Sequence, residues 1–260
     1  MIEEPYRWVE AISNRREYIE HQIEAGSPIV CLGYKDGILF LTLSRERQKI
    51  FEIYDRIAMG AMGHPGDIER LRMAAIEVTS TEGFTRSAQD VSLRRLANYS
   101  LSPVLKAAFE QIYGAPYLAR MLFAELGRGD DPNFFVRIDY DGSIHSNGGP
   151  LSRISENFGV ISGTTLSMNT MEKFLRQQDL LNLNLEHALG IALDAWTVGH
   201  MMVGKDALDE LPSSEAIATH RQEQLASNII EAAVLEHTGS LPITYRPLKR
   251  EELEVFQKHL

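Results

Sequence analysis

The chain changes character at the pair Gly26–Ser27, within the stretch IEAGSPIVCLGYKDGILFLT. The residues before this pair have a helical pattern, and the residues after it have the pattern of a strand. In one class of hydrolases a junction of this kind is cut, and the hydroxyl of the new N-terminal residue becomes the nucleophile. Ser27 is therefore either a nucleophile that cleavage would free or an ordinary residue of an uncut chain.

The other candidate nucleophile in this region is Cys31, the single cysteine of the sequence. Its flanking residues, IVCLG, have the pattern of a buried strand, where a thiol is usually inert. The sequence has no GxGxxG, P-loop, HExxH or GxSxG motif, and its eight histidines lack the spacing of metal ligands. We therefore expect neither a cofactor nor a bound metal.

The composition limits the classes of partner. The chain has 260 residues, of which 44% are hydrophobic, enough for one sizeable core, and no linker or internal repeat divides it. A formal net charge of −10 argues against nucleic acid or a membrane as a partner, because both require a basic surface. A single cysteine, the lack of a signal-peptide pattern and the lack of an apolar run of about 18 residues predict a cytoplasmic protein.

The elements that position Ser27 follow from the hydrophobic pattern. Residues 6–25 have an amphipathic helical pattern, and Gly26 is a fitting C-terminal stop for this helix. The strands expected next are 28–34, 37–43 and the two halves of 49–63, with the turn signal Lys-Asp-Gly between the first two.

Two helices are expected after these strands. The first covers residues 67–78. The second is a long helix over residues 87–114, which Ser87 and Asp90 open as a capping box and which Pro103 kinks or divides.

The remainder of the chain returns to strands and helices. Further strands are expected at 116–127, 133–144, 157–165 and 243–248, and further helices at 167–178, 183–204 and 249–260. Residues 228–237 fit a helix or a strand equally well, and the charged stretch around 209–216 reads as an exposed loop or insertion. Strand hairpins separated by pairs of helices indicate an α+β fold, with antiparallel sheets stacked inside and helices outside.

Several strings are specific enough to indicate a family. YKDGILFL, followed by SRERQKIFEIYDRIAMGAMGHPGDIERLRMAAI, closely resembles the α-type subunits of the 20S proteasome core, especially the bacterial form of actinobacteria. RIDYDGSI, GVISGTT, IIEAAVLE and YRPLKREELEVF resemble later segments of the same family. The resemblance implies the four-layer αββα sandwich of the N-terminal-nucleophile hydrolases. It also implies one domain over 1–260, made of an N-terminal tail and helix (1–25), the sandwich (26–245) and a C-terminal helix (246–260).

By this resemblance, Ser27 stands at the nucleophile position of the active β-type subunits and Lys49 at the position of their lysine. Pro28 would constrain a nucleophile at a new N-terminus, and Leu43 occupies the place of the aspartate on the second strand. The helical segment 6–25 resembles the helix that α-type subunits keep across the would-be active-site cleft. We therefore expect that the chain cuts no bond itself.

Three functional hypotheses result. The leading one is a structural subunit whose ring caps the proteasome core, gates substrate entry, nucleates β-ring assembly and docks an ATPase. The second is an N-terminal-nucleophile peptidase or amidase that is cut before Ser27. The third is a proteasome-like homo-oligomeric ring without a separate β chain.

The resemblance also predicts a docking pocket between adjacent α subunits of a homo-heptameric ring. There the Lys49 ammonium would pair with the C-terminal carboxylate of a ring-shaped ATPase activator, and Gly26 would let that tail approach the backbone. His64 stands where archaeal members have an aliphatic pocket residue. The expected partners are therefore other copies of the chain, proteasome β subunits and the activator.

Overall fold

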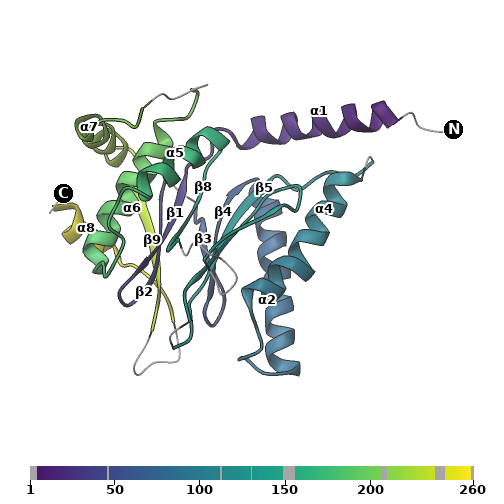
Figure 1. Ribbon diagram of the computed structural model, residues 1–260, viewed down its shortest axis with the longest axis horizontal. Helices are drawn as coiled ribbons and strands as arrows, with labels where there is room; N and C mark the ends of the chain where they lie inside the picture. The colour runs from purple at the N-terminus through teal and green to yellow at the C-terminus, as the bar shows by residue number, and fades with distance from the viewer. Residues whose placement is uncertain are drawn as a thin grey trace.

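Two five-stranded sheets stack face to face in the computed structural model, and helices cover their outer faces (Figure 1). The structure describes residues 5–45, 47–111, 113–129, 131–148, 156–205, 210–237 and 244–258. Neighbouring strands in both sheets are antiparallel. The predicted α+β fold, a four-layer αββα sandwich with an additional N-terminal helix, is confirmed.

The first sheet has the strand order β10-β9-β2-β1-β8. In chain order its strands are β1 (Ile29–Tyr34), β2 (Gly37–Ser44), β8 (Phe158–Ile161), β9 (Ile229–Glu236) and β10 (Tyr245–Pro247). Tyr34 lies opposite Gly37, so the predicted turn between β1 and β2 consists of Lys35 and Asp36. The segment that fitted a helix or a strand equally well forms β9, because it pairs along the whole of β2.

The second sheet has the order β3-β4-β5-β6-β7. Its strands are β3 (Ile50–Tyr54), β4 (Ile57–Gly63), β5 (Ala119–Glu125), β6 (Phe134–Ile138) and β7 (Ile144–Gly148). The two strands expected within 49–63 are confirmed as β3 and β4, and the turn between them follows Tyr54, which lies opposite Ile57. The strands of this sheet follow one another in chain order, but helices lie between β4 and β5 in the sequence.

An apolar layer fills the space between the two sheets. Its buried members include Ile29, Cys31, Ile38, Phe40, Ile50, Leu122, Phe135, Ile161 and Leu235. The sheets approach closely at Gly60, where an added Cβ would lie 2.9 Å from Cγ2 of Ile29. Cys31 is fully buried in this layer, and burial raises the pKa of its thiol well above the ordinary value, as expected for an inert cysteine.

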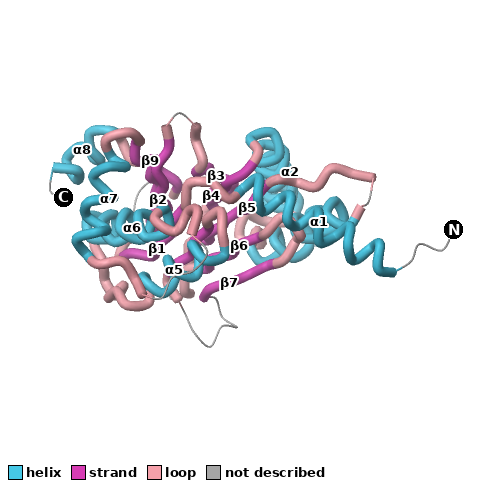
Figure 2. The backbone as a smooth tube through the Cα atoms, turned by 90° about the horizontal axis from the view of Figure 1, so that it is seen from above, coloured by secondary structure: helices cyan, strands magenta, loops and turns pink. Residues whose placement is uncertain are grey.

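Helices form the two outer layers. The first sheet is covered by α5 (Thr165–Leu175) and α6 (Leu185–His200), with α7 (Ser214–Leu225) and α8 (Arg250–Lys258) beside them. The second sheet is covered by α2 (Pro65–Thr85), α3 (Leu93–Arg95), the π-helical segment η1 (Leu96–Leu101) and α4 (Ser102–Glu110). Figure 2 shows the strands lying between these two groups of helices. No helix in the described ranges is both long enough and apolar enough to cross a bilayer.

The helical segment predicted over 87–114 begins later in the structure than predicted, and its interior is interrupted. The proposed capping box at Ser87 is wrong: the side chain of Ser92 accepts from the backbone of Arg95 and caps the helix instead. The interruption expected at Pro103 is confirmed. The π-helical segment η1 ends at Leu101, and α4 begins directly after it with Ser102 and Pro103. Proline has no N–H to donate to the preceding turn, so the irregular turn precedes it.

The charged stretch predicted as an exposed loop is helical in its described C-terminal part. Ser213 caps α7, accepting a hydrogen bond from the backbone N–H of Ala216 at 3.3 Å. The ion pair between Arg221 and Asp194, at 2.6 Å, attaches α7 to α6. The first residue of the charged stretch, 209, lies outside the described residues, as do residues 206–208 before it.

Helix α1 (Pro5–Ile23) packs along one end of the sandwich, above β4, β5 and α4 (Figure 1). Ile19 and Ile23 are 0% and 2% exposed and pack against Phe109 and Tyr140. Arg15 donates to the carbonyl oxygens of the residues that end α4, among them Phe109 at 2.9 Å. The predicted helix over 6–25 is therefore present and attached to the body of the protein.

A buried arginine links the two sheets at the same end. The side chain of Arg120, on β5, is 5% exposed and forms an ion pair with Asp139, which follows β6. It also donates to the carbonyl of Ser162, which follows β8 in the other sheet. Because Arg120 satisfies groups from both layers, we expect the fold to depend on it.

We predict that Arg120→Met lowers the free energy of unfolding by about 3 kcal/mol, because it leaves the Asp139 carboxylate and the Ser162 carbonyl without their buried donor. Chemical denaturation of the purified chain measures this. Arg176→Met is the control: Arg176 pairs with Glu156 and Glu172, but its side chain is 50% exposed, so its loss should cost less than about 1 kcal/mol. Equal effects of the two substitutions would contradict the assignment.

Candidate functional site

Ser27 lies between the end of α1 and the start of β1, and its hydroxyl is fully engaged. The Oγ atom donates to the carbonyl oxygen of Leu43 at 2.7 Å. It accepts from the indole Nε1 of Trp196 at 3.2 Å and lies 3.3 Å from Oγ1 of Thr42. A carbonyl, an indole N–H and a hydroxyl are not bases at neutral pH, so these neighbours do not activate the hydroxyl.

Leu43 and Pro28, the two residues whose identity argued against catalysis, both lie beside Ser27 in the structure. Leu43 is 2% exposed, and its side chain packs in the core beneath α5 and α6. This position therefore offers Ser27 a backbone carbonyl in place of a carboxylate. The following residue, Pro28, accepts a hydrogen bond from Thr42 at 2.6 Å, which holds the junction against β2.

Lys49 is half-buried immediately before β3, and its backbone is held on both sides. Its N–H lies 2.9 and 3.0 Å from the two carboxylate oxygens of Glu231, and its carbonyl accepts from the N–H of Ala61 at 2.9 Å. Burial lowers the pKa of the Lys49 ammonium below its ordinary value, and the negative charge of Glu231 opposes this shift. Burial also raises the pKa of Glu231. The hydrogen bonds from the backbone N–H groups of Lys49 and Ile50, and the charge of Lys49, lower this pKa and so oppose the effect of burial.

Gly26 and His64 lie near the end of β4. A Cβ at Gly26 would lie 2.1 Å from Cε of Met62, the flexible end of that side chain, and 2.9 Å from the backbone carbonyl oxygen of Ile23. The backbone contact is the one that favours glycine here. His64 directly follows β4, is exposed, and occupies the N-cap position of α2 without a hydrogen bond from its side chain. Its backbone N–H donates to the carbonyl of Leu118 at 2.7 Å.

The three predicted pocket residues share one structural neighbour. The backbone carbonyl of Lys49 is hydrogen-bonded to Ala61, and Gly26 packs on Met62. His64 directly follows the last residue of β4. All three positions therefore lie along the end of β4. The structure thus brings Lys49, Gly26 and His64 to one end of the second sheet. Whether an activator docks there stays a prediction.

A cavity of about 530 Å³ lies beside this cluster. Its lining includes Gln48 and Ile50, on either side of Lys49, together with Glu231 and Tyr245, whereas Lys49 itself is absent from it. The cavity is therefore a neighbour of the predicted pocket and not the pocket itself.

Two residues of this region escaped the sequence analysis. Trp196, the donor to Ser27, lies in α6, a mainly apolar helix whose pattern marked no residue as special. Glu231 had a usable signal, since it is the one charged residue in the run IIEAAVL. A charged residue inside an apolar strand requires a partner.

Comparison with known proteins gives the family. Residues 23–195 match the family described as proteasome subunit. A relative from Kineococcus radiotolerans, named proteasome subunit alpha, is 31% identical over 229 residues, which cover 87% of this chain and 86% of the relative. Relatives of the same name from a Parafrankia species and from Mycobacterium leprae are 34% and 33% identical, over 72% and 73% of this chain and 73% and 68% of their own lengths.

The chain belongs to the proteasome subunit family. Within that family it is an α-type subunit of the 20S core, of the kind found in actinobacteria, as the sequence resemblance predicted.

We predict that the purified chain keeps its N-terminal segment, because the groups around Ser27 offer no base for cleavage or catalysis. Its intact mass should correspond to the uncut chain, and an electrophile directed at hydroxyl nucleophiles should not label Ser27. An active β-type subunit treated in parallel serves as the positive control. Loss of residues 1–26, or labelling of Ser27, would show that the peptidase hypothesis is correct.

Proposed function

We propose that the chain is a non-catalytic subunit of the α ring of a bacterial 20S proteasome. In this proposal, seven copies form the end ring that gates substrate entry, templates assembly of the β ring and docks a ring-shaped ATPase activator. The observation that carries the non-catalytic part is the satisfied hydroxyl of Ser27, whose hydrogen-bonding neighbours are Leu43, Trp196 and Thr42.

The packing of α1 supports the same conclusion. Maturation at Ser27 would detach a helix whose Ile19 and Ile23 are buried against the body of the protein. Burial of two such side chains contributes about 3–6 kcal/mol, before the hydrogen bonds of Arg15 are added. These contacts support a structural role for α1 in an uncut chain, at the end of the sandwich where Ser27 lies.

The docking role is proposed from the placement of Lys49. A half-buried ammonium at the edge of a sheet is suited to pairing with a terminal carboxylate, because partial desolvation strengthens charge-assisted hydrogen bonds. Gly26 and His64, at the same end of β4, are the proposed walls of the site. By the family resemblance the remaining wall comes from the adjacent subunit.

Purification from the native host tests the ring assignment. A protein that copurifies with β subunits, and whose native mass corresponds to stacked seven-membered rings, supports the proposed function. Seven-membered rings of this chain alone, with proteolytic activity, would support the stand-alone ring instead.

For docking, we predict that Lys49→Ala weakens stimulation by the copurified ring ATPase roughly ten- to hundredfold, because removing the charge of one hydrogen-bonded ion pair costs about 1.5–3 kcal/mol. The measurement is the degradation of an unfolded protein by the assembled core at increasing ATPase concentration. Assembly of the rings, followed by native mass spectrometry, should be unchanged.

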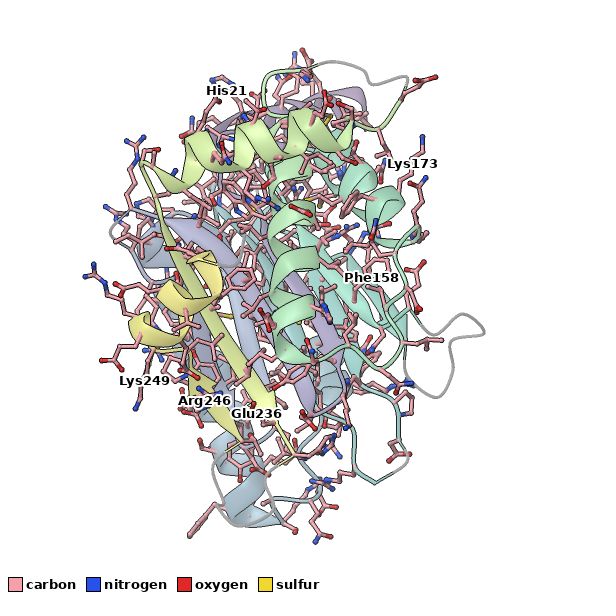
Figure 3. All side chains as sticks on the ribbon, turned by 90° about the vertical axis from the view of Figure 1, so that its left-hand side faces the viewer. His21, Phe158, Lys173, Glu236, Arg246 and Lys249 are labelled. Atoms are coloured by element: carbon pink, nitrogen blue, oxygen red, sulfur yellow. The ribbon has the colours of Figure 1, made fainter. Side chains whose placement is uncertain are left out.

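Lys173→Ala is the matched control, since it removes an exposed lysine from α5 on the outer layer of the first sheet (Figure 3). It should leave stimulation as it is. If Lys49→Ala responds to the ATPase as the unsubstituted protein does, docking through this residue is refuted.

A further inference from the structure

Glu231 has a position unlike that of its neighbours on β9. Alternate residues of this strand, Ile230, Ala232 and Val234, pack beneath the helices, and Ala233 and Leu235 pack between the sheets. By this alternation the side chain of Glu231 faces the other sheet, at the strand end nearest Lys49. A carboxylate at such a half-buried position needs hydrogen-bond donors to offset its desolvation.

The donors come from the start of β3. The N–H of Lys49 lies within 3.0 Å of both oxygens of Glu231, and the N–H of Ile50 donates to Oε1 at 2.8 Å. One side chain of the first sheet therefore holds two consecutive backbone groups at the first strand of the second sheet. On the opposite side, Ala61 holds the carbonyl of Lys49, so the backbone of this residue is fixed from both directions.

We infer that Glu231 is the positioning residue for Lys49: its carboxylate fixes the backbone that carries this lysine and places a negative charge beside it. The inference deepens the proposed function. It rests on that function only where it assigns the Lys49 ammonium the role of binding an incoming carboxylate. The arrangement itself consists of contacts within one chain.

Other ionisable groups lie near Lys49 and Glu231. Besides these two, the described ionisable groups around this site include Tyr245 from β10, which lies within range of the charges of Glu231 and Glu52. Arg45 and Arg47 line the same cavity as Glu231 and Tyr245. Burial, together with the charges of Glu231 and Glu52, raises the pKa of Tyr245 to about 12, so this phenol is neutral at physiological pH. The negative charge of Glu231 opposes the lowering of the Lys49 pKa by burial.

The inference predicts the titration of Lys49. Because burial lowers the pKa of this amine and Glu231 opposes the shift, removing the charge in Glu231→Gln should lower the pKa further. The amine would then lose its proton, and become nucleophilic, at a lower pH. A glutamine also has one acceptor oxygen in place of two, so the N–H groups of Lys49 and Ile50 would share a weaker partner.

The test measures the rate of Lys49 acetylation by acetic anhydride as a function of pH, and the hydrogen exchange of the peptide that contains Lys49 and Ile50, both by mass spectrometry. In Glu231→Gln we expect the midpoint of labelling to fall by about one pH unit and exchange of these two amides to accelerate about tenfold or more. An unchanged midpoint would show that Glu231 only connects the two sheets, and would overturn the inference.

Glu236→Gln is the matched control. Glu236 is on the same strand, accepts from the hydroxyl of Tyr34 at 2.7 Å and pairs with Arg246 at the other end of β9 (Figure 3). This substitution should cost similar stability without moving the titration of Lys49. Equal shifts in the two variants would mean that general loosening, and not Glu231 itself, sets the behaviour of Lys49.

Glu231→Asp keeps the test valid if the glutamine variant fails to fold. It retains the charge but shortens the side chain, so exchange of the Lys49 and Ile50 amides should accelerate while the labelling midpoint stays closer to that of the unsubstituted protein. Unchanged exchange overturns the positioning role. A failure of Lys49→Ala to affect the ATPase, together with the expected titration shift, would refute the docking proposal and leave this inference intact.

Discussion

The contact between the two sheets is the interaction on which the other features of the molecule depend. β1, β2, β4 and β5 are buried on both faces, against the opposite sheet on one side and the helices on the other. A shift of one residue in such a strand would exchange the side chains of the two apolar layers, so the register is strongly determined. The same register places Leu43 beside Ser27, and the stacking of the sheets brings Glu231 to Lys49.

The state of Ser27 follows from a chain that remains whole. In an N-terminal-nucleophile enzyme, the free α-amine of the nucleophile helps to take up its proton. Here the nitrogen of Ser27 belongs to an amide that continues from Gly26 and α1, and an amide is not a base. The indole of Trp196 and the carbonyl of Leu43 then satisfy the hydroxyl, so the residue has the role of a hydrogen-bonded link between α1, β2 and α6.

Local patterns predicted most of the elements, because turns such as Lys35-Asp36 and the apolar stripe of α1 are written in adjacent residues. The start of the helix after α2 was different. Ser87 and Ser92 are both suitable caps by sequence, but the helix begins at Leu93, whose N–H is held by Glu125 of β5 at 3.0 Å. Glu231 was missed for the same reason, since its partners lie 181 and 182 residues away in the chain. The placement of Lys49, Gly26 and His64 came from family resemblance, whereas periodicity alone could not have found it.

The support around Lys49 has a consequence for the proposed docking role. An exposed lysine that binds a carboxylate must lose its hydration and order both its backbone and its side chain, and the side chain alone costs up to about 2 kcal/mol in entropy. At Lys49 the backbone is already held by Glu231 and Ala61, and part of the desolvation has already occurred on folding. An incoming carboxylate would therefore need to order little more than the lysine side chain. Glu231 in turn is oriented toward the backbone N–H groups of Lys49 and Ile50, so its charge can support the ammonium while its own oxygens remain engaged.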